Sequence, residues 1–181
     1  MRRRKLIKNI VCVILFLAIA CVVFISQLRL EKDRYRPTQE YALTPDIKDR
    51  ISLIPSDNPI EIIKSSNDLC CELLSFSAKN DITNGKANCV GYAQLSSAII
   101  NYAFKLNDMP YKARPVVGQV YCFGMNITAL SQKILPAKHR PFFKDHDFVE
   151  VDLGHKAIYV DCSLQDLIGL CYNELRTDID Q

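Results

Sequence analysis

The sequence predicts an α+β fold, in which helices pack on a small antiparallel sheet, behind a single N-terminal membrane-spanning helix. Three observations support this prediction. Two segments with helical periodicity come early in the domain, segments with strand character follow them, and an apolar run with a basic flank begins the chain. Helices followed by strands are typical of α+β domains, whereas a parallel sheet requires the two to alternate.

The length of 181 residues allows one domain and an appendage. A domain of roughly 110 to 150 residues buries about two thirds of the surface that its unfolded chain exposes, so we expect one hydrophobic core. We divide the chain into three parts: residues 1–30 are a basic flank and membrane anchor, residues 31–60 a tether, and residues 61–181 the folded domain.

The N-terminal segment has the features of a signal anchor. Residues 10–25 are all apolar, and four consecutive cations, residues 2–5, precede them. A membrane span requires about 20 mostly apolar residues, so residues 6–28 are long enough if Lys8 reaches the membrane interface. A cationic N-terminal flank stays in the cytoplasm, which places the domain outside, with a bacterial inner membrane and periplasm as the expected setting.

Other interpretations of this segment remain open. Ala18-Ile19-Ala20 has the form of a signal-peptidase site, although cleavage there would leave apolar residues at the start of the mature protein. Ala18 to Cys21 also resembles a bacterial lipoprotein box, in which Cys21 would be acylated, but an apolar rather than a polar segment follows. A buried helix in a cytosolic protein is a further alternative, which the basic flank disfavours.

The charge distribution argues against a nucleic-acid partner. The first thirty residues hold six basic side chains and no acidic one, so the remainder carries 17 of the 23 basic and all 20 acidic side chains, a net charge of −3. Nucleic-acid binding requires a clustered basic face. We therefore expect contact with a membrane through the N-terminal helix, no nucleic acid, and no cofactor.

The eight cysteines leave the disulfide pattern open. Two lie in the predicted anchor, where they are expected to be small hydrophobic residues. The other six are Cys70, Cys71, Cys89, Cys122, Cys162 and Cys171. An extracytoplasmic setting permits disulfides, but the count does not give their connectivity. If Cys89 is a free nucleophile, at least one other of these six stays unpaired.

The periodicity predicts two helices after the tether. Residues 31–59 contain four prolines without a sustained period, which predicts a tether with at most one short helix. Residues 61–78 place apolar side chains at helical spacing. A turn at Asn84-Gly85 follows, and a second helix begins at Cys89 and ends at residues 107–110.

The strands come next. Residues 111–123 are rich in valine and aromatic residues, which predicts a strand, and a loop with Pro136 and Pro141 follows. Residues 147–153 and 157–160, joined by a turn at residues 154–156, predict an antiparallel hairpin.

Cys89, His146 and Asp161 are the candidate catalytic residues. A cysteine at a helix N-terminus faces unpaired backbone N–H groups and the positive end of the helix dipole, which favour a thiolate and can hold an oxyanion. His146 opens one strand of the hairpin and Asp161 ends the other, so the two lie side by side. A carboxylate there orients an imidazole and stabilises its charged form. A buried structural cysteine, a surface histidine and a turn aspartate are the alternatives.

Other residues near these three are substrate-binding candidates. Gly91 would let a substrate backbone approach closely, and Asn88 and Gln94 are polar in a segment that otherwise packs. Strand alternation places Phe148 on the face of His146 and turns Asp147 to the opposite face.

Three segments resemble the transglutaminase-like superfamily. Residues 85–95, Gly-Lys-Ala-Asn-Cys-Val-Gly-Tyr-Ala-Gln-Leu, resemble its nucleophile motif, commonly Gly-x-Cys-x-[Asp/Gly]-Tyr-Ala, and residues 108–118 are similar to its link from the Cys helix to the first strand. Residues 146–151, His-Asp-Phe-Val-Glu-Val, resemble its His-x-Trp-x-Glu-Val strand, and residues 159–161 its final aromatic and Asp element. The resemblance covers residues 66–170.

This resemblance implies a papain-like core and acyl transfer at Cys89, with His146 as base and then acid and Asp161 orienting its ring. The substrate would be an amide of a peptide or protein, with an envelope protein as one candidate. The chain departs from the family pattern because it has no tryptophan, so Phe148 replaces the usual aromatic residue. The side-chain oxyanion donor of some relatives has no clear counterpart, and Asn84 or Gln94 are the candidates.

The family also contains inactive scaffolds, so fold alone does not settle the activity. The alternative to an enzyme is a noncatalytic binding module in the cell envelope. A zinc site built from Cys, His and Asp is a third possibility, but the chain lacks the CxxC and HxxxH spacings that are typical of zinc ligands. We therefore expect no metal.

Overall fold

An antiparallel sheet forms one layer of the protein. The structure, a computed structural model, describes residues 19–20, 22–23, 26–37, 41–54, 57–134, 144–168 and 173–176. The strand order is β1-β4-β6-β7-β8, and β5 pairs with the end of β4. The strands are β1 (Leu28–Tyr35), β4 (Lys112–Cys122), β5 (Met125–Asn126), β6 (His146–Asp152), β7 (Ala157–Val160) and β8 (Asn173–Arg176).

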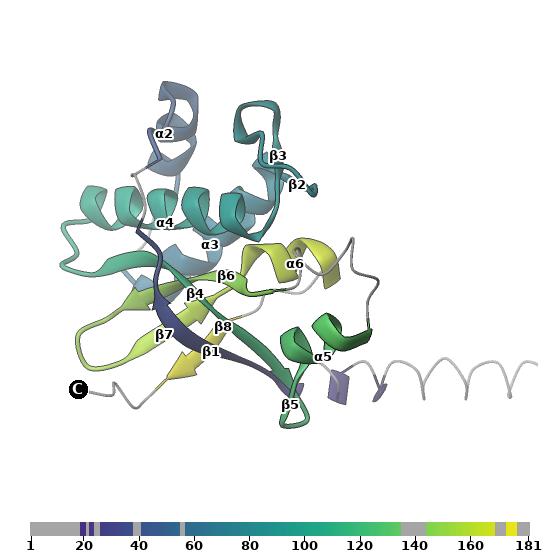
Figure 1. The fold of residues 1–181 in the computed structure, drawn as a ribbon. Helices are drawn as coiled ribbons and strands as arrows, with labels where there is room; N and C mark the ends of the chain where they lie inside the picture. The colour runs from purple at the N-terminus through teal and green to yellow at the C-terminus, as the bar shows by residue number, and fades with distance from the viewer. Residues whose placement is uncertain are drawn as a thin grey trace, which may run out of the picture.

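Helices cover one face of this sheet. The helix α4 (Cys89–Leu106) packs directly on β4 and β6, and α2 (Pro45–Ser52) and α3 (Pro59–Leu73) pack on α4 (Figure 1). The short α6 (Cys162–Ile168) contacts α3 and α4, whereas α5 (Ile127–Ile134) lies beside β4 at the end of the sheet that carries β5 (Figure 1). The predicted α+β class is confirmed.

A small two-stranded unit separates α3 from α4. It consists of β2 (Ser75–Phe76) and β3 (Lys86–Ala87), which pair in parallel, and of a single 3₁₀ turn, η1 (Ile82–Asn84). Gly85 follows this turn with a φ of 68°, a left-handed conformation that glycine adopts without strain. This unit fixes the point at which the chain enters α4.

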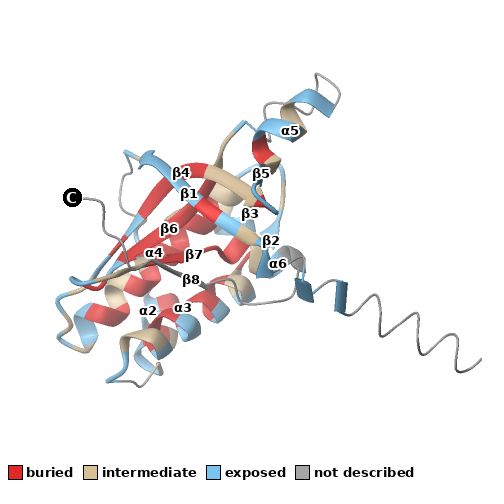
Figure 2. Ribbon diagram, turned by 90° about the horizontal axis from the view of Figure 1, so that it is seen from below, coloured by how far each residue is buried: buried red, intermediate tan, exposed pale blue. Residues whose placement is uncertain are grey.

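The main core lies between α4 and the sheet. It joins apolar side chains of α2, α3 and α4 to residues of β4, β6 and β7 such as Val149, Val151 and Val160. A second cluster on the other face of the sheet consists of Leu30, Val116, Phe148 and Tyr159. Figure 2 shows that the buried residues gather in the central strands and on the inner sides of α3 and α4.

The helix and strands that carry the candidate site begin close to where the sequence predicts them. The structure confirms the strand predicted at residues 111–123, the hairpin of β6 and β7, and the helix that begins at Cys89. The helix predicted over residues 61–78 is shorter at its end, because Leu74 takes an extended conformation and the next two residues pair with β3. Elements α5, α6 and β8 were not predicted.

The prediction that residues 31–60 form a tether is wrong for much of this segment. Residues 31–35 belong to β1, which pairs with β4 along its length, and α2 packs on α4. The edge strand β1 escaped prediction because most of its side chains are charged and exposed, while Leu30 alone is fully buried.

The predicted membrane anchor, residues 6–28, lies largely outside the described residues, as does the loop with Pro136 and Pro141. Its last residue, Leu28, begins β1 instead of ending a helix. Within the part of the chain that the structure describes, no helix combines the length and the apolar character needed to cross a membrane. The five described cysteines, which are Cys70, Cys71, Cys89, Cys122 and Cys162, are free thiols.

Candidate functional site

Cys89 is the first residue of α4, where the helix start is held by two asparagines. The side chain of Asn88 caps the helix by accepting the N–H of Val90 at 3.1 Å, and the Asn88 N–H donates to Oδ1 of Asn80 at 2.8 Å. These bonds fix the backbone beneath the half-buried thiol. Asn88 thus has a structural use as a cap, and the structure shows no role for it toward a substrate.

Gly91 is required by packing within the protein. A Cβ at this position would lie 2.7 Å from Oδ1 of Asn80, in the loop after β2, and 2.8 Å from Cβ of Ala87, in β3. Gly91 was expected to admit a substrate backbone, but the groups that approach it closely are Asn80 and Ala87 of the protein itself. The glycine lets these two residues pack on the first turn of α4, which places Cys89.

The hairpin of β6 and β7 brings His146 and Asp161 together, as alternation and the tight turn predict. Nε2 of His146 bonds Oδ2 of Asp161, and the carboxylate of Asp161 is 1% exposed. Oδ1 of Asp161 accepts the hydroxyl of Ser163 at 2.7 Å and the N–H of Leu164 at 3.0 Å, so Asp161 also caps α6. Both oxygens of this buried carboxylate are satisfied.

This pair favours the charged imidazolium. Burial lowers the pKa of His146, but the charge and hydrogen bond of Asp161 and the neighbouring Cys89 raise it well above its usual range. Burial raises the pKa of Asp161, yet the charge and hydrogen bond of His146 and the two α6 bonds outweigh this and lower it. We expect an ionised pair at neutral pH.

The thiol of Cys89 lies within reach of the imidazole, since Cys89 is one of the hydrogen-bonding groups that raise the His146 pKa. Nε2 of His146 is bonded to Asp161, so Nδ1 is the ring nitrogen left for the thiol. The structure therefore brings all three predicted catalytic residues into one cluster: a thiol at a helix N-terminus, an imidazole beside it, and a buried carboxylate behind the imidazole.

A second carboxylate, Asp147, faces the same thiol. Its Oδ2 is 3.9 Å from Sγ of Cys89, and the residue is 2% exposed. Alternation places Asp147 on the face of β6 opposite to Phe148, as predicted, but that face is the one that meets Cys89, so Asp147 was missed as a site residue. The other odd-numbered residues of β6, Val149 and Val151, face the core under α4, so Asp147 lies on the face where α4 begins.

Arg36 neutralises Asp147. Its Nε bonds Oδ1 of Asp147, and a second guanidinium nitrogen bonds Oδ2 at 2.8 Å, which makes a two-pronged ion pair. Arg36 directly follows β1, in the segment predicted as a tether, and no sequence motif near it points to the site. The available signal in the sequence was the acidic Asp147 on the same face of its strand as Val149 and Val151, because a buried carboxylate requires a cation as partner.

Phe148 supports the site from the core instead of contacting a substrate. It is 1% exposed, its ring stacks at 6.4 Å on the imidazole of His146, and it packs edge-on against Tyr159 at 5.0 Å. Gly118, opposite His146 in β4, makes room for it, because a Cβ there would lie 2.9 Å from Cε1 of Phe148 and 2.0 Å from the carbonyl oxygen of Glu31.

The two oxyanion candidates do not join the cluster. Asn84 is exposed in η1, where its amide donates to Oδ2 of Asp81 at 2.8 Å. Gln94 lies one and a half turns after Cys89 on α4 and lines a neighbouring cavity. The backbone N–H groups at the start of α4 are thus the nearest candidate donors for an oxyanion.

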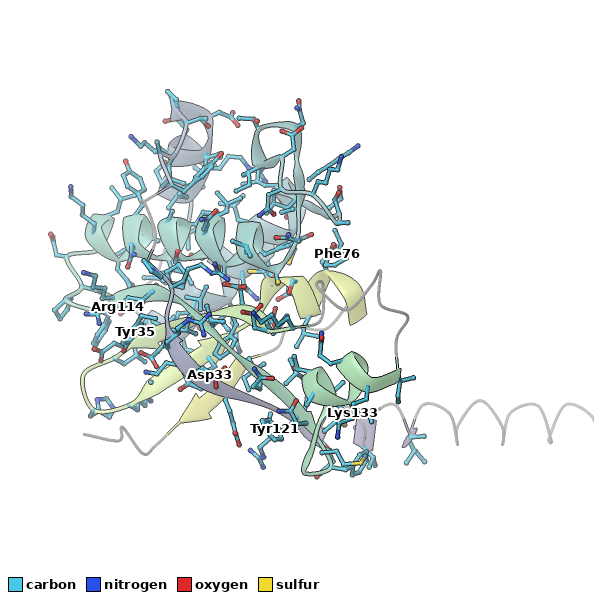
Figure 3. The ribbon with its side chains drawn as sticks, viewed as in Figure 1. Asp33, Tyr35, Phe76, Arg114, Tyr121 and Lys133 are labelled. Atoms are coloured by element: carbon cyan, nitrogen blue, oxygen red, sulfur yellow. The ribbon has the colours of Figure 1, made fainter. Side chains whose placement is uncertain are left out.

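That cavity has a volume of about 640 Å³ and is basic. It lies between α4, the start of β4 and the end of β1. Its cations are Arg36, Lys48, Lys105, Lys112 and Arg114, and its aromatic residues are Tyr35, Tyr41 and Tyr102. Two cations stack on these rings, Arg114 at 5.3 Å from Tyr35 and Lys48 at 5.7 Å from Tyr102. Figure 3 shows Tyr35 and Arg114 together below α4. None of the lining residues is acidic.

Among the described residues, no group of three or more His, Cys, Asp or Glu side chains is arranged to hold a metal ion. Comparison of the chain with protein-family models, with curated proteins and with solved structures finds no match. The functional argument therefore rests on the side chains of this site and on their geometry.

Proposed function

We propose that this protein is a membrane-anchored thiol enzyme of transglutaminase-like type, with a papain-like core, that cleaves or transfers acyl groups at amide bonds outside the cytoplasm. The observation that carries the proposal is the cluster of Cys89, His146 and Asp161, in which a buried and fully bonded carboxylate holds an imidazole beside a thiol at a helix N-terminus and raises the pKa of that imidazole. This combination is the one that nucleophilic cysteine catalysis requires.

In the proposed reaction the thiolate of Cys89 attacks the amide carbonyl carbon. Backbone N–H groups at the start of α4 other than that of Val90, which the Asn88 cap occupies, stabilise the oxyanion that forms. His146, already protonated, gives its proton to the leaving nitrogen as the carbon–nitrogen bond breaks, which leaves a thioester on Cys89. His146 then takes a proton from water or from an acceptor amine, whose attack releases the acyl group and restores the thiolate beside a protonated His146.

The cellular setting of this proposal follows from the N-terminal sequence. Four cations ahead of an apolar run favour an anchor with a cytoplasmic N-terminus, so the domain would face the periplasm of a bacterial inner membrane. A substrate in the envelope, such as a peptide or protein amide, is consistent with this setting.

The proposal is tested by trapping the nucleophile. The full chain in detergent is treated with a peptide vinyl sulfone, which captures an activated thiol, and the site of modification is mapped by peptide mass. Amide turnover is measured in parallel on a peptide mixture by mass spectrometry. We expect rapid capture at Cys89, slow capture in His146→Ala, and turnover that Cys89→Ala abolishes and the control Cys71→Ala retains. Turnover that survives Cys89→Ala would overturn the proposal.

The basic cavity favours a second candidate function, a noncatalytic module that binds an anionic ligand. A volume of about 640 Å³ lies within the size range of small-molecule sites, roughly 300 to 1,000 Å³. Five of the 17 basic residues outside the N-terminal thirty line it, with none of the 20 acidic residues. Arg36 is already paired with Asp147, so an anion with several charges would gain from the other four, Lys48, Lys105, Lys112 and Arg114.

Calorimetry with inorganic pyrophosphate distinguishes this function from catalysis. A binding module should bind the probe equally in wild type and in Cys89→Ala, and lose it in the double variant Lys105→Ala/Arg114→Ala. Lys156→Ala, in the turn between β6 and β7, is the matched control and should bind normally. Absence of binding by the wild type, or equal binding by the double variant, would exclude this function.

A further inference from the structure

The sheet register shows which end of the domain lies next to the predicted anchor. The apolar run at residues 10–25 is followed, after Ser26 and Gln27, by Leu28, which is the first residue of β1 and is paired with Cys122, the last residue of β4. The turn that follows Cys122 leads into β5 and then α5. Figure 1 shows β5 and α5 at the end of the sheet where the chain enters β1.

Exposed apolar side chains are concentrated at this end. Of the eleven large apolar side chains that are exposed among the described residues, four belong to what we call the β5–α5 surface: Phe123, Met125, Leu130 and Ile134. Three more, Ile19, Val22 and Val23, precede β1. Leu130 and Ile134 lie one turn apart on α5, so they share a face of that helix. Figure 3 shows the cation Lys133 in the same region.

The opposite end of the sheet has a different character. There the turn between β6 and β7 contains Gly154, His155 and Lys156, and the adjacent Asp152 is exposed. The paired residues Lys112 and Asp152 mark this end on β4 and β6. The domain thus has an apolar end beside the predicted anchor and a polar end about 33 Å away along β4, at 3.3 Å per residue.

We propose that the β5–α5 surface rests on the outer face of the lipid bilayer, beside the point where the N-terminal anchor leaves it. This inference builds on the anchor in the proposed function. The sequence favours a bilayer as the occupant, because the apolar run at residues 10–25 stops only two residues before β1, and β1 begins at this end of the sheet. The exposed Lys133 suits anionic headgroups.

The register also places the candidate active site close to this surface. Gly118 of β4 pairs with both Lys32 of β1 and His146 of β6. It is four residues from Cys122, so His146 lies about 13 Å along the strands from the membrane end. The substrate class that follows is an amide in a juxtamembrane peptide segment or in a peptide carried by a lipid, and not an amide far from the membrane.

The absence of tryptophan from the sequence allows a direct test. Met125→Trp and Leu130→Trp each introduce a single fluorophore on the β5–α5 surface, in a Cys89→Ala chain so that the readout is independent of catalysis. The full chain is inserted into phosphatidylglycerol and phosphatidylcholine vesicles whose lipids carry brominated acyl chains. Ser26→Trp reports the anchor, and His155→Trp at the polar end is the matched control.

We expect blue-shifted and strongly quenched emission from Trp at positions 125, 130 and 26, and unquenched emission at position 155. Quenching at position 26 alone would overturn the lipid contact while leaving the anchor intact, and a protein partner would then be the occupant to seek. No quenching at positions 125, 130 or 26 would overturn both the contact and the anchor. The quenching results do not test the reactivity of Cys89, which the vinyl sulfone experiment measures separately.

Discussion

Arg36 and Asp147 form a two-pronged ion pair directly beside the Cys89 thiol, although 111 residues separate them in sequence. Asp147 is a buried acid whose uncompensated charge would oppose a thiolate at 3.9 Å. Arg36 removes this repulsion and also ties the end of β1 to the start of β6. Through Arg36, the edge strand β1 therefore helps to position and neutralise Asp147 beside Cys89.

The first prediction concerns this pair. In Arg36→Ala, Asp147 stays buried without its partner, so we expect slower alkylation of Cys89 and a loss of about 2 kcal/mol in the free energy of unfolding, typical of hydrogen bonds to charged groups. Urea denaturation and the alkylation rate with iodoacetamide measure the two effects.

Two further variants serve as controls for Arg36→Ala. Arg36→Lys keeps the charge but not the paired geometry, so its effect should be intermediate. Arg36→Ala/Asp147→Asn removes both charges and should recover the alkylation rate of Cys89. If Arg36→Ala alkylates as fast as wild type, Asp147 does not influence the thiol.

The second prediction concerns the pH dependence of His146. Asp161 is the main group that raises the His146 pKa, so Asp161→Asn should shift the imidazole titration to lower pH, because burial then dominates. Asp161→Glu keeps the charge and is the control. NMR of the histidine ring protons follows the titration. A titration that is unchanged in Asp161→Asn would show that the pair is not ionised in the folded protein.

The same pair sets a pH window of stability. The raised pKa of His146 stabilises the fold fully below the unfolded value of about 6.5, and this contribution is lost as pH rises through the raised pKa. The lowered pKa of Asp161 stabilises the fold above the unfolded value of about 3.9, and this contribution is lost as pH falls through the lowered pKa. The difference in the free energy of unfolding between wild type and Asp161→Asn should be largest between the two unfolded pKa values, from about pH 3.9 to about pH 6.5.

The third prediction concerns thiol selectivity. Burial raises the pKa values of Cys122 and Cys162. The pKa of Cys71 is raised mainly by a hydrogen bond with Cys162 and also by burial. These three thiols should therefore stay neutral and resist iodoacetamide near pH 7 until the protein is unfolded. Peptide mass mapping before and after guanidinium treatment measures this. Equal labelling of Cys122 and Cys89 in the folded protein would contradict the account.

The fourth prediction concerns Gly118. A Cβ at this position meets the backbone oxygen of Glu31 at 2.0 Å, which a rotamer change cannot relieve. We expect Gly118→Ala to cost about 1–3 kcal/mol through overpacking and to slow Cys89 alkylation by displacing Phe148 beneath His146. Gly124→Ala, where a Cβ meets nothing within 4 Å, should cost only about 1 kcal/mol from its positive φ. Equal thermal stability of the two variants would contradict this view of β4.

The elements that carry the triad follow from local signals. The apolar spacing of α4, the Asn-Gly turn before it and the hairpin of β6 and β7 are each encoded within a few neighbouring residues. His146 and Asp161 sit at the ends of the hairpin strands, so their meeting could be predicted from the hairpin, whereas the place of Cys89 beside them was implied by the family resemblance.

What escaped prediction depends on contacts between distant segments. The strand β1 exists because β4, more than eighty residues later, supplies its hydrogen bonds, and its charged side chains hide it from any apolar pattern. The role of Asp147 depends on which face of β6 meets the start of α4, which alternation alone does not give. Gly91 shows the same limit, because its close neighbour is the chain's own loop.

The most direct test of the central claim is the pH dependence of Cys89 alkylation in the full chain, compared between wild type and His146→Ala. A protonated His146 beside Cys89 predicts that wild-type Cys89 reacts faster than the other thiols of the folded protein at pH values below the raised pKa of His146, and that His146→Ala loses this advantage. If Cys89 reacts with the same pH dependence in both proteins, His146 does not activate the thiol, and the proposal of a catalytic cluster is wrong.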